Sequence, residues 1–252
     1  MAQLKILTLN IERDKHLEVV NSFIERESPD VFCVQEIFER DFNVLKNKFG
    51  FQGLFIPMCK IIDSEKLTQI IGVALLSKLP IENGNKVYYH KPSEEINFYT
   101  NRTLEEKYAS IHHGIIWGNI NKDGTEFTIG TTHFTWTPNG MPDKYQEEDL
   151  KNLFKILDNI PDLVLCGDFN IPRKYNYLYN KLVNRFKDNI PDEIKTTLTM
   201  SKHKSRINPV EAERVGTYVV DYIFSTPKYT VNNVKCEYEI SDHAAIIGVV
   251  SI

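Results

Sequence analysis

The sequence predicts an α/β protein in which mixed β-sheets are covered by helices on their outer faces. Short apolar runs rich in β-forming residues alternate with segments whose apolar residues recur at helical spacing. These runs are nearly continuously apolar, as expected of strands that are buried on both faces. Strands and helices do not follow a strict βαβ rhythm, and this irregular order favours mixed sheets over a single parallel sheet.

The first elements form a strand–helix–strand unit. Residues 4–9 and 31–35 are apolar and β-prone, and each predicts a strand. Between them, apolar residues recur every three or four positions and predict a helix, which ends at the turn Ser28-Pro29-Asp30. The apolar residues of this helix are Leu17, Val20, Phe23 and Ile24.

The rest of the chain continues this mixture of strands and helices. A hairpin turn, Asn121-Lys122-Asp123-Gly124, separates two of the strands. A helix is predicted at about 143–159 and a shorter helical stretch near 175–186, whereas 90–108 and 191–216 are polar and irregular. The further strands are predicted at 70–76, 86–90, 111–120, 126–132, 162–166, 218–225, 229–238 and 245–251. With no repeat and no linker-like stretch, residues 1–252 are expected to form one domain.

Composition excludes several functional classes. The 252 residues carry a formal net charge of −4 and are 42% hydrophobic, which argues against a protein that coats nucleic acid through a positive field. The 4 cysteines are widely spaced, so neither a disulfide scaffold nor a thiolate zinc site is expected. The N-terminus shows no leader and no apolar run could cross a bilayer, so we expect a cytoplasmic protein. No feature of the sequence indicates an obligate protein partner.

Polar groups stand at the ends of many predicted strands. A carboxylate at the end of a buried strand is costly unless it is paired, hydrogen-bonded or bound to a metal. Any one of these groups could be a turn or a cap, but their repetition in one chain points to a site. The groups are Asn10-Ile11-Glu12, Gln35-Glu36, Thr131-Thr132-His133, Gly167-Asp168-Phe169-Asn170, Asp221 and Ser241-Asp242-His243.

Part of this set suits a divalent cation. Hard oxygen ligands are available from Glu36, Glu12, Asp242 and the side-chain carbonyl of Asn10. Mg²⁺ prefers such ligands and keeps several waters, and Mn²⁺ is the alternative. No cluster of histidine or cysteine ligands favours zinc.

The remaining residues suit hydrolysis of a phosphate ester. Asp168 could orient and deprotonate the attacking water, while the amides of Asn170 and Asn10 could hold phosphate oxygens. His133 and His243 could donate to the developing charge, and a carboxylate such as Asp221 could fix the tautomer of one of them.

These motifs, in this order, resemble the endonuclease/exonuclease/phosphatase superfamily, which includes deoxyribonuclease I. The resemblance spans residues 4–252, and it is closest to the 5′-tyrosyl-DNA phosphodiesterase branch, although the Trp that precedes the Asn in that branch is Leu9 here. It implies a four-layer α/β sandwich, two packed mixed sheets flanked by helices. The matching segments are Thr8-Leu9-Asn10, Gln35-Glu36, Thr132-His133, Gly167-Asp168-Phe169-Asn170, Asp221-Tyr222-Ile223-Phe224 and Ser241-Asp242-His243.

The resemblance also implies a role for each matched residue. Glu36 would be the principal metal ligand, with Asn10 and Asp242 nearby. Asp168 would activate the water, Asn170 would hold the phosphate, and His133 would contact the phosphate or assist the leaving group. His243 would stabilise the transition state and would be oriented by Asp221. Where many members carry an Arg two residues before that Asp, this chain has Val219, which puts substrate contacts in doubt more than the chemistry.

Residues outside the motifs could contact the substrate. Trp136 follows the His133 motif and could stack on a base, or it could pack in the core. The others lie in polar stretches that are also typical of exposed loops. The candidates for substrate binding are Trp136, Tyr108, Arg102, Asn101, Lys204 and Arg206.

Three functions compete at this stage. The favoured one is a Mg²⁺-dependent phosphodiesterase acting on nucleic acid, either a nuclease or an enzyme that processes DNA ends. The alternative is a phosphatase or phospholipase acting on an inositol phosphate, a sphingolipid or another small phosphoester. A non-catalytic binding scaffold ranks last, because such a protein should have lost site residues and the acids and both histidines are in place.

Overall fold

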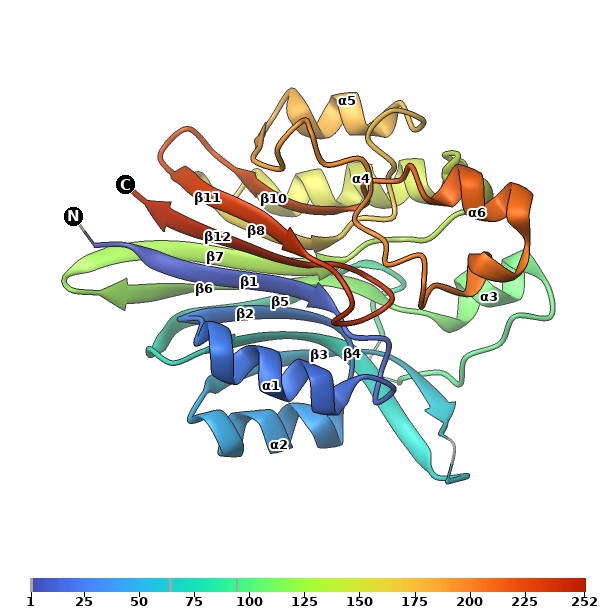
Figure 1. Cartoon of the computed structure of the whole chain (residues 1–252), viewed down its shortest axis with the longest axis horizontal. Helices are drawn as coiled ribbons and strands as arrows, with labels where there is room; N and C mark the ends of the chain where they lie inside the picture. The colour runs from blue at the N-terminus through green and yellow to red at the C-terminus, as the bar shows by residue number, and fades with distance from the viewer. Residues whose placement is uncertain (1, 64, 94) are drawn as a thin grey trace.

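The computed structural model describes residues 2–63, 65–93 and 95–252. In this part of the chain, two six-stranded sheets pack against each other and helices cover their outer faces (Figure 1). The predicted four-layer α/β sandwich with mixed sheets is therefore confirmed. Each sheet contains one parallel pair, β1–β2 in the first and β7–β8 in the second, among antiparallel pairs.

The order of strands brings segments from both ends of the chain together. In the first sheet, the C-terminal strands lie beside the N-terminal strand. Its order is β11 (Thr230–Glu237), β12 (Ala245–Ser251), β1 (Leu4–Asn10), β2 (Val31–Phe38), β4 (Thr68–Ser77) and β3 (Gln52–Ile62). The order of the second is β5 (Ile81–His90), β6 (His113–Lys122), β7 (Thr125–His133), β8 (Val164–Asp168), β10 (Asp221–Ser225) and β9 (Lys187–Asp188).

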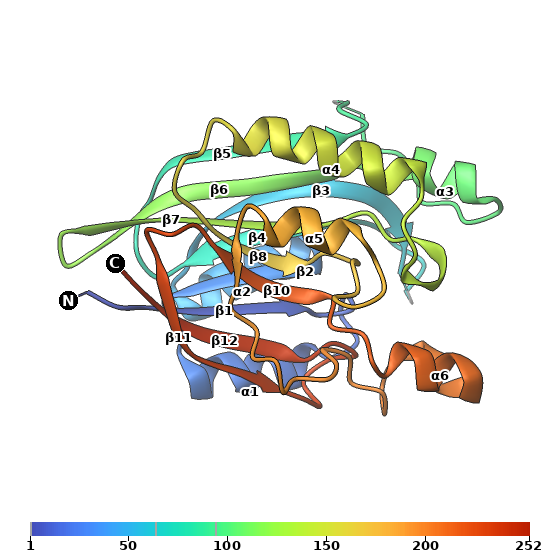
Figure 2. The same cartoon turned by 90° about the horizontal axis from the view of Figure 1, so that it is seen from above.

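The helices divide between the two outer faces and one end of the sandwich. Helices α1 (Leu17–Glu27) and α2 (Glu39–Phe49) cover the first sheet, while α4 (Lys144–Leu157) and α5 (Leu178–Val183) cover the second (Figures 1 and 2). Both views place α3 (Leu104–Ser110) and α6 (Pro209–Val215) at the same end of the molecule. The short 3₁₀ turns are η1 (Pro138–Gly140) and η2 (Lys204–Ile207). Among the residues that the structure describes, no helix has the length and apolar character needed to cross a membrane.

Alternating side chains along β1 explain why this strand is apolar throughout. Leu4 and Ile6 face the core between the two sheets, whereas Leu7 packs with Val20 and Phe23 of α1 on the outer side. Each fully buried aliphatic or aromatic side chain contributes about 1.5–3 kcal/mol relative to an exposed one. A strand with two apolar faces is thus stable only between two layers, as here.

The elements predicted from sequence differ from the structure mainly where local signals are weak. The helical stretch predicted at 175–186 is shorter, because α5 spans only Leu178–Val183. The stretches 90–108 and 191–216 were expected to be irregular, but they contain part of α3 and all of α6. Both helices are short and begin at side-chain caps, Thr103 and Asn208, whose oxygens accept backbone N–H groups.

Two longer elements were not predicted. Helix α2 is more polar overall than α1 and α4, and an acidic residue, Asp41, lies beside Phe42 and Leu45 on its buried side. Strand β3 contains Pro57, and its register with β4 shifts between Pro57 and Cys59, which interrupts the alternation on which the prediction depends. The predicted hairpin is confirmed: Lys122 pairs with Thr125, and the two loop residues Asp123 and Gly124 both have positive φ.

Candidate active site

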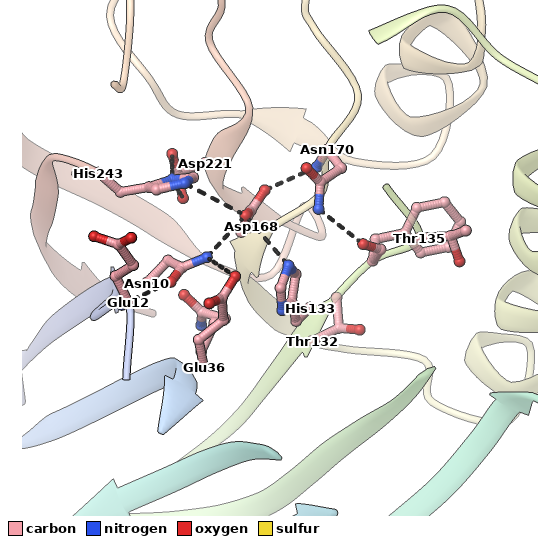
Figure 3. Close-up of polar contacts among 12 residues, drawn as sticks. Asn10, Glu12, Glu36, Thr132, His133, Thr135, Asp168, Asn170, Asp221 and His243 are labelled. Carbon is pink, nitrogen blue, oxygen red and sulfur yellow. Dashed lines mark hydrogen bonds and ion pairs between the residues drawn. The ribbon is translucent and has the colours of Figure 1, made fainter. Parts of the chain in front are cut away.

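Strand direction explains why the polar groups predicted at strand ends come together. The parallel strands β1 and β2 end at the same edge of the first sheet, and β7 and β8 end together in the second. Within the second sheet, His133 pairs in register with Asp168 across β7 and β8. Strand β10 runs antiparallel to β8, so its first residue, Asp221, pairs with Asp168 at the same end. Figure 3 shows these side chains converging with Asn10 and Glu36.

A bulge in β2 turns Glu36 out of the sheet. The register between β2 and β4 shifts between Val34 and Ile37, and Glu36 adopts a φ of 55°. Bulges often re-aim a side chain beside an active site. Gln35, next to it, stays buried and donates to Thr131 of the opposite sheet at 3.0 Å. The bulge therefore sends one residue into the interface between the sheets and the next into the cleft.

Gly167 allows the close approach of β7 to β8 directly before Asp168. Its φ is 140°, and a Cβ atom there would lie 2.0 Å from the backbone oxygen of Thr132. We expect Gly167→Ala to lower the free energy of unfolding by about 3 kcal/mol, because the added methyl group would force the two strands apart. Urea unfolding followed by circular dichroism measures this loss.

The matched control is Gly50→Ala. Gly50 also has positive φ, 68°, but a Cβ atom there would have nothing within 4 Å. This variant should lose only about 1–2 kcal/mol, the cost of a left-handed backbone for an L-residue. If Gly167→Ala proved as stable as Gly50→Ala, the close strand contact would not limit this position.

Asp168 lies at the centre of the cluster and is buried. Its Oδ2 accepts a hydrogen bond from Nδ2 of Asn10 at 3.1 Å and lies 3.4 Å from Nε2 of His133 and 3.8 Å from Nε2 of His243. Its Oδ1 accepts from the backbone N–H of Asn170 at 2.9 Å. Burial raises the pKa of Asp168, but His243 and His133 outweigh it and lower this pKa to about 2. The carboxylate is therefore ionised throughout the physiological pH range.

Asp221 orients His243 toward Asp168. Both carboxylate oxygens of Asp221 lie within 3.0 Å of Nδ1 of His243. Because a carboxylate only accepts, Nδ1 carries a proton and Nε2 is left to face Asp168. Burial disfavours the charged imidazole, yet Asp221 and Asp168 raise the pKa of His243 well above its ordinary value. His243 is thus held as a cationic donor at the base of the cleft.

His133 is the second imidazole beside Asp168. Burial opposes its charged form, but the hydrogen bond and charge of Asp168 raise its pKa above the ordinary value. The backbone oxygen of His133 accepts from Nδ1 of His113 at 2.8 Å, which fixes the end of β7 from behind. No motif surrounds His113 in the sequence, so this role was not predicted.

Asn170 has its backbone in the left-handed region, with a φ of 52°, which asparagine tolerates. Its Nδ2 donates to the backbone oxygen of Phe134 at 3.0 Å, and this leaves its second amide hydrogen for a ligand. Gln146 of α4 donates to the backbone oxygens of Thr135 and Asn170 and so joins the two loops. Gln146 was not predicted as a site residue, although a polar residue on the buried side of a predicted helix was the available signal.

Two of the residues expected to bind a metal, Glu12 and Glu36, form hydrogen bonds with Asn10. Nδ2 of Asn10 donates to Glu36 at 3.2 Å, and Oδ1 of Asn10 accepts from the backbone N–H of Glu12. Burial, and then the negative charges of Glu12 and Glu36, raises the pKa of Asp242. Carboxylates that repel one another in this way fit a divalent cation. The carboxylate of Glu12 also contacts Lys15 and His16, so it is partly neutralised within the chain.

Among the histidine, cysteine and acidic side chains that the structure describes, only Asp168, Asp221 and His243 bring three ligand atoms within 4.8 Å of one another. Atoms of this group are already engaged in the Asp221–His243 hydrogen bonds, and the raised pKa of His243 disfavours the neutral imidazole that a metal needs. The oxygen set around Asn10 is therefore the better candidate for the metal.

A cleft of about 450 Å³ opens above these residues. Of the residues predicted to contact substrate, Trp136, Tyr108 and Lys204 line it. Tyr108 is nevertheless almost fully buried, and its hydroxyl donates to Asp143 at 2.5 Å, which attaches α3 to the start of α4.

The other three candidates for substrate binding are not among the residues that line the described cleft. Arg102 pairs with Glu106 on α3, and its neighbour Asn101 is exposed. Arg206 donates to the backbone oxygen of Lys202 at 2.8 Å. Lys107, which the sequence analysis did not single out, does line the cleft.

Solved structures with the same fold include proteins with different activities. An endonuclease/exonuclease/phosphatase from Beutenbergia cavernae has a TM-score of 0.72 at 18% identity, over 100% of this chain and 72% of that one. Mannosyl-6-phosphatase Bt3783 from Bacteroides thetaiotaomicron has 0.70 at 14% identity, over 99% and 100% of the two chains. A humanized D. rerio TDP2 has 0.65 at 14% identity, over 99% of each chain. At these identities the likeness shows the fold alone and does not select a branch.

No curated protein matches the chain. The model of the Endonuclease/Exonuclease/phosphatase family matches residues 7–243. Members of this family are phosphoester hydrolases that generally depend on a divalent metal, and the buried acidic and histidine residues described above agree with this chemistry. The chain therefore belongs to the Endonuclease/Exonuclease/phosphatase family of phosphoester hydrolases.

Proposed function

We propose that this chain is a Mg²⁺-dependent phosphodiesterase that acts on nucleic acid, through in-line attack of a water held by Asp168. The observation that carries the proposal is the surrounding of Asp168, whose ionised carboxylate lies beside the Nε2 atoms of His133 and His243. A carboxylate that can orient a water thus lies beside imidazole donors that can stabilise developing charge.

Different residues around this centre bind the metal and orient the water. When bound by Glu36, Asp242 and Asn10, a divalent cation supplies Lewis-acid stabilisation of charge on the phosphate oxygens. Asp168 orients the water and accepts its proton. The low pKa of Asp168 keeps it ready to accept a hydrogen bond but makes it a weak base, so its main contribution is orientation of the water.

Asn170 and the two histidines interact with the phosphate of the substrate. The free amide hydrogen of Asn170 can bind a phosphate oxygen, and the cationic His243 can stabilise the transition state. His133 contacts the phosphate or assists the leaving group. The cleft continues beyond this centre along Trp136 and Lys204, and this extension favours a substrate longer than one phosphate group.

A cleavage assay tests the proposal. The panel contains a 5′-phosphotyrosyl oligonucleotide, single-stranded and double-stranded DNA, an abasic duplex, poly(A) RNA, an inositol polyphosphate and a sugar 6-phosphate. We expect hydrolysis of a nucleic-acid substrate with Mg²⁺, weaker or comparable hydrolysis with Mn²⁺, and none with EDTA. Release only from the sugar or inositol phosphate would favour the phosphatase alternative, and silence across the panel would contradict the proposal.

A further inference from the structure

Two lysines from distant parts of the chain meet over one indole ring in the wall of the cleft. Nζ of Lys107, on α3, lies 3.2 Å from the centroid of the ring of Trp136, and Nζ of Lys204, on η2, lies 6.0 Å from it. All three residues line the cleft that contains Asp168. Trp136 is 37% exposed, so its ring is not simply part of the core.

The two ammonium groups form no close contact with a carboxylate in the described part of the chain, although the charge of Glu36 acts on Lys107 from a distance. Among residues 2–63, 65–93 and 95–252, neither forms an ion pair or donates a hydrogen bond to the protein. Burial, and then the charge of Lys204, lowers the pKa of Lys107 to about 8. A neutral ring attracts each cation but does not cancel its charge. The arrangement therefore keeps two like charges close together at a position where an anion would relieve their repulsion.

Residues close in sequence to Trp136 and next to Lys204 contact the catalytic residues. Trp136 follows the end of β7, and the next residue after His133, Phe134, donates its backbone N–H to the backbone oxygen of Asp168 at 2.8 Å. Lys204 follows His203, whose ring centroid lies 6.5 Å from that of His243. A group bound beside these lysines would thus lie in the same cleft as a phosphate at Asp168.

We propose that Lys107, Lys204 and Trp136 form a subsite for a second phosphate of the substrate, next to the phosphate that is hydrolysed. This inference rests on the proposed function, and it narrows the substrate to molecules with two neighbouring phosphates, such as adjacent nucleotides of a strand. The ammonium groups bind the second phosphate, and the exposed part of the indole ring packs against the group that carries it. A sugar with a single phosphate would leave this subsite unused.

Binding without turnover tests the subsite. The protein carries Asp168→Asn and is kept in Mg²⁺, and the probes are thymidylyl-thymidine with and without a 5′-phosphate. Fluorescence follows binding, since Trp136 and Trp117 are the 2 tryptophans of the chain. We expect the 5′-phosphate to lower Kd roughly tenfold, which corresponds to about 1.4 kcal/mol.

Replacing both lysines should remove this advantage. In Lys107→Met with Lys204→Met, which keeps the apolar stems, the ratio of the two Kd values should fall below about twofold. Lys151→Met with Lys174→Met removes the same charge from exposed positions outside the cleft lining and should keep the tenfold ratio. Lys204→Met alone, at an exposed position, should reduce the ratio even if the double variant folds poorly.

Equal affinities of the two probes for the lysine-intact protein, including a failure of both to bind, would overturn the subsite. So would a tenfold ratio that persists in the double lysine variant. Failure of the proposed function has a different signature, because the wild-type chain would then hydrolyse none of the nucleic-acid substrates whatever the ratio of the two Kd values.

Discussion

Replacing Asp168 with asparagine is expected to lower kcat by about 10²–10⁴-fold, because the variant loses the carboxylate that orients the water and accepts its proton. The new side chain keeps an oxygen for the backbone N–H of Asn170, so the loop after β8 should stay in place. It puts an amide where Nδ2 of Asn10 now donates, and it removes the charge that faces both histidines. Single-turnover kinetics on the substrate found in the cleavage assay gives the change in kcat.

The control for Asp168→Asn is Asp188→Asn. Asp188 is another largely buried carboxylate of the second sheet, paired with Arg173 at 2.8 Å and absent from the cleft lining. Its variant should retain kcat within a few-fold, although some stability is lost with the ion pair. Substrate binding by Asp168→Asn should remain close to that of the wild type. Turnover near the wild-type level would remove Asp168 from the role proposed for it.

His243→Ala is expected to lower kcat by about 10²–10³-fold, as the loss of one preorganised donor does elsewhere. The loss arises because Asp221 holds the imidazole with Nε2 facing the centre and its neighbours keep it charged. KM should change little, since the donor acts mainly on charge that develops in the transition state. Steady-state kinetics separates the two parameters.

Asp221→Asn provides a second test of the same pair. An amide in that position can still accept from Nδ1, but it no longer stabilises the charge on the ring. Its kcat should fall by less than that of His243→Ala. If His243→Ala raised KM and left kcat unchanged, His243 would be a residue that binds the ground state of the substrate.

The apolar pattern predicted mixed sheets with helices on their outer faces, because each segment shows in its own sequence which of its faces is buried. The four-layer arrangement was implied by the family resemblance. An alternating or continuous apolar pattern, as in residues 4–9 and 31–35, shows which faces of a strand are buried. It does so without regard to which distant segment covers them. The sequence also identified Asp168 and Asp221 as candidates, because acids that end or begin buried strands need a reason to be there. Short capped helices such as α3 and α6 carry too little apolar periodicity for this reasoning.

Tertiary structure decided which of these groups meet. The register of β8 against β7 and β10 puts Asp168 between His133 and Asp221. A bulge in β2, which no local sequence pattern predicted, turns Glu36 into the same cleft. The sequence made Lys204 a candidate for substrate binding but gave no signal for Lys107. The packing of α3 and η2 at one end of the sandwich brings both lysines close to Trp136. Periodicity encodes the direction of burial, whereas distances between remote side chains depend on strand register and packing, and these are settled only when the whole chain folds.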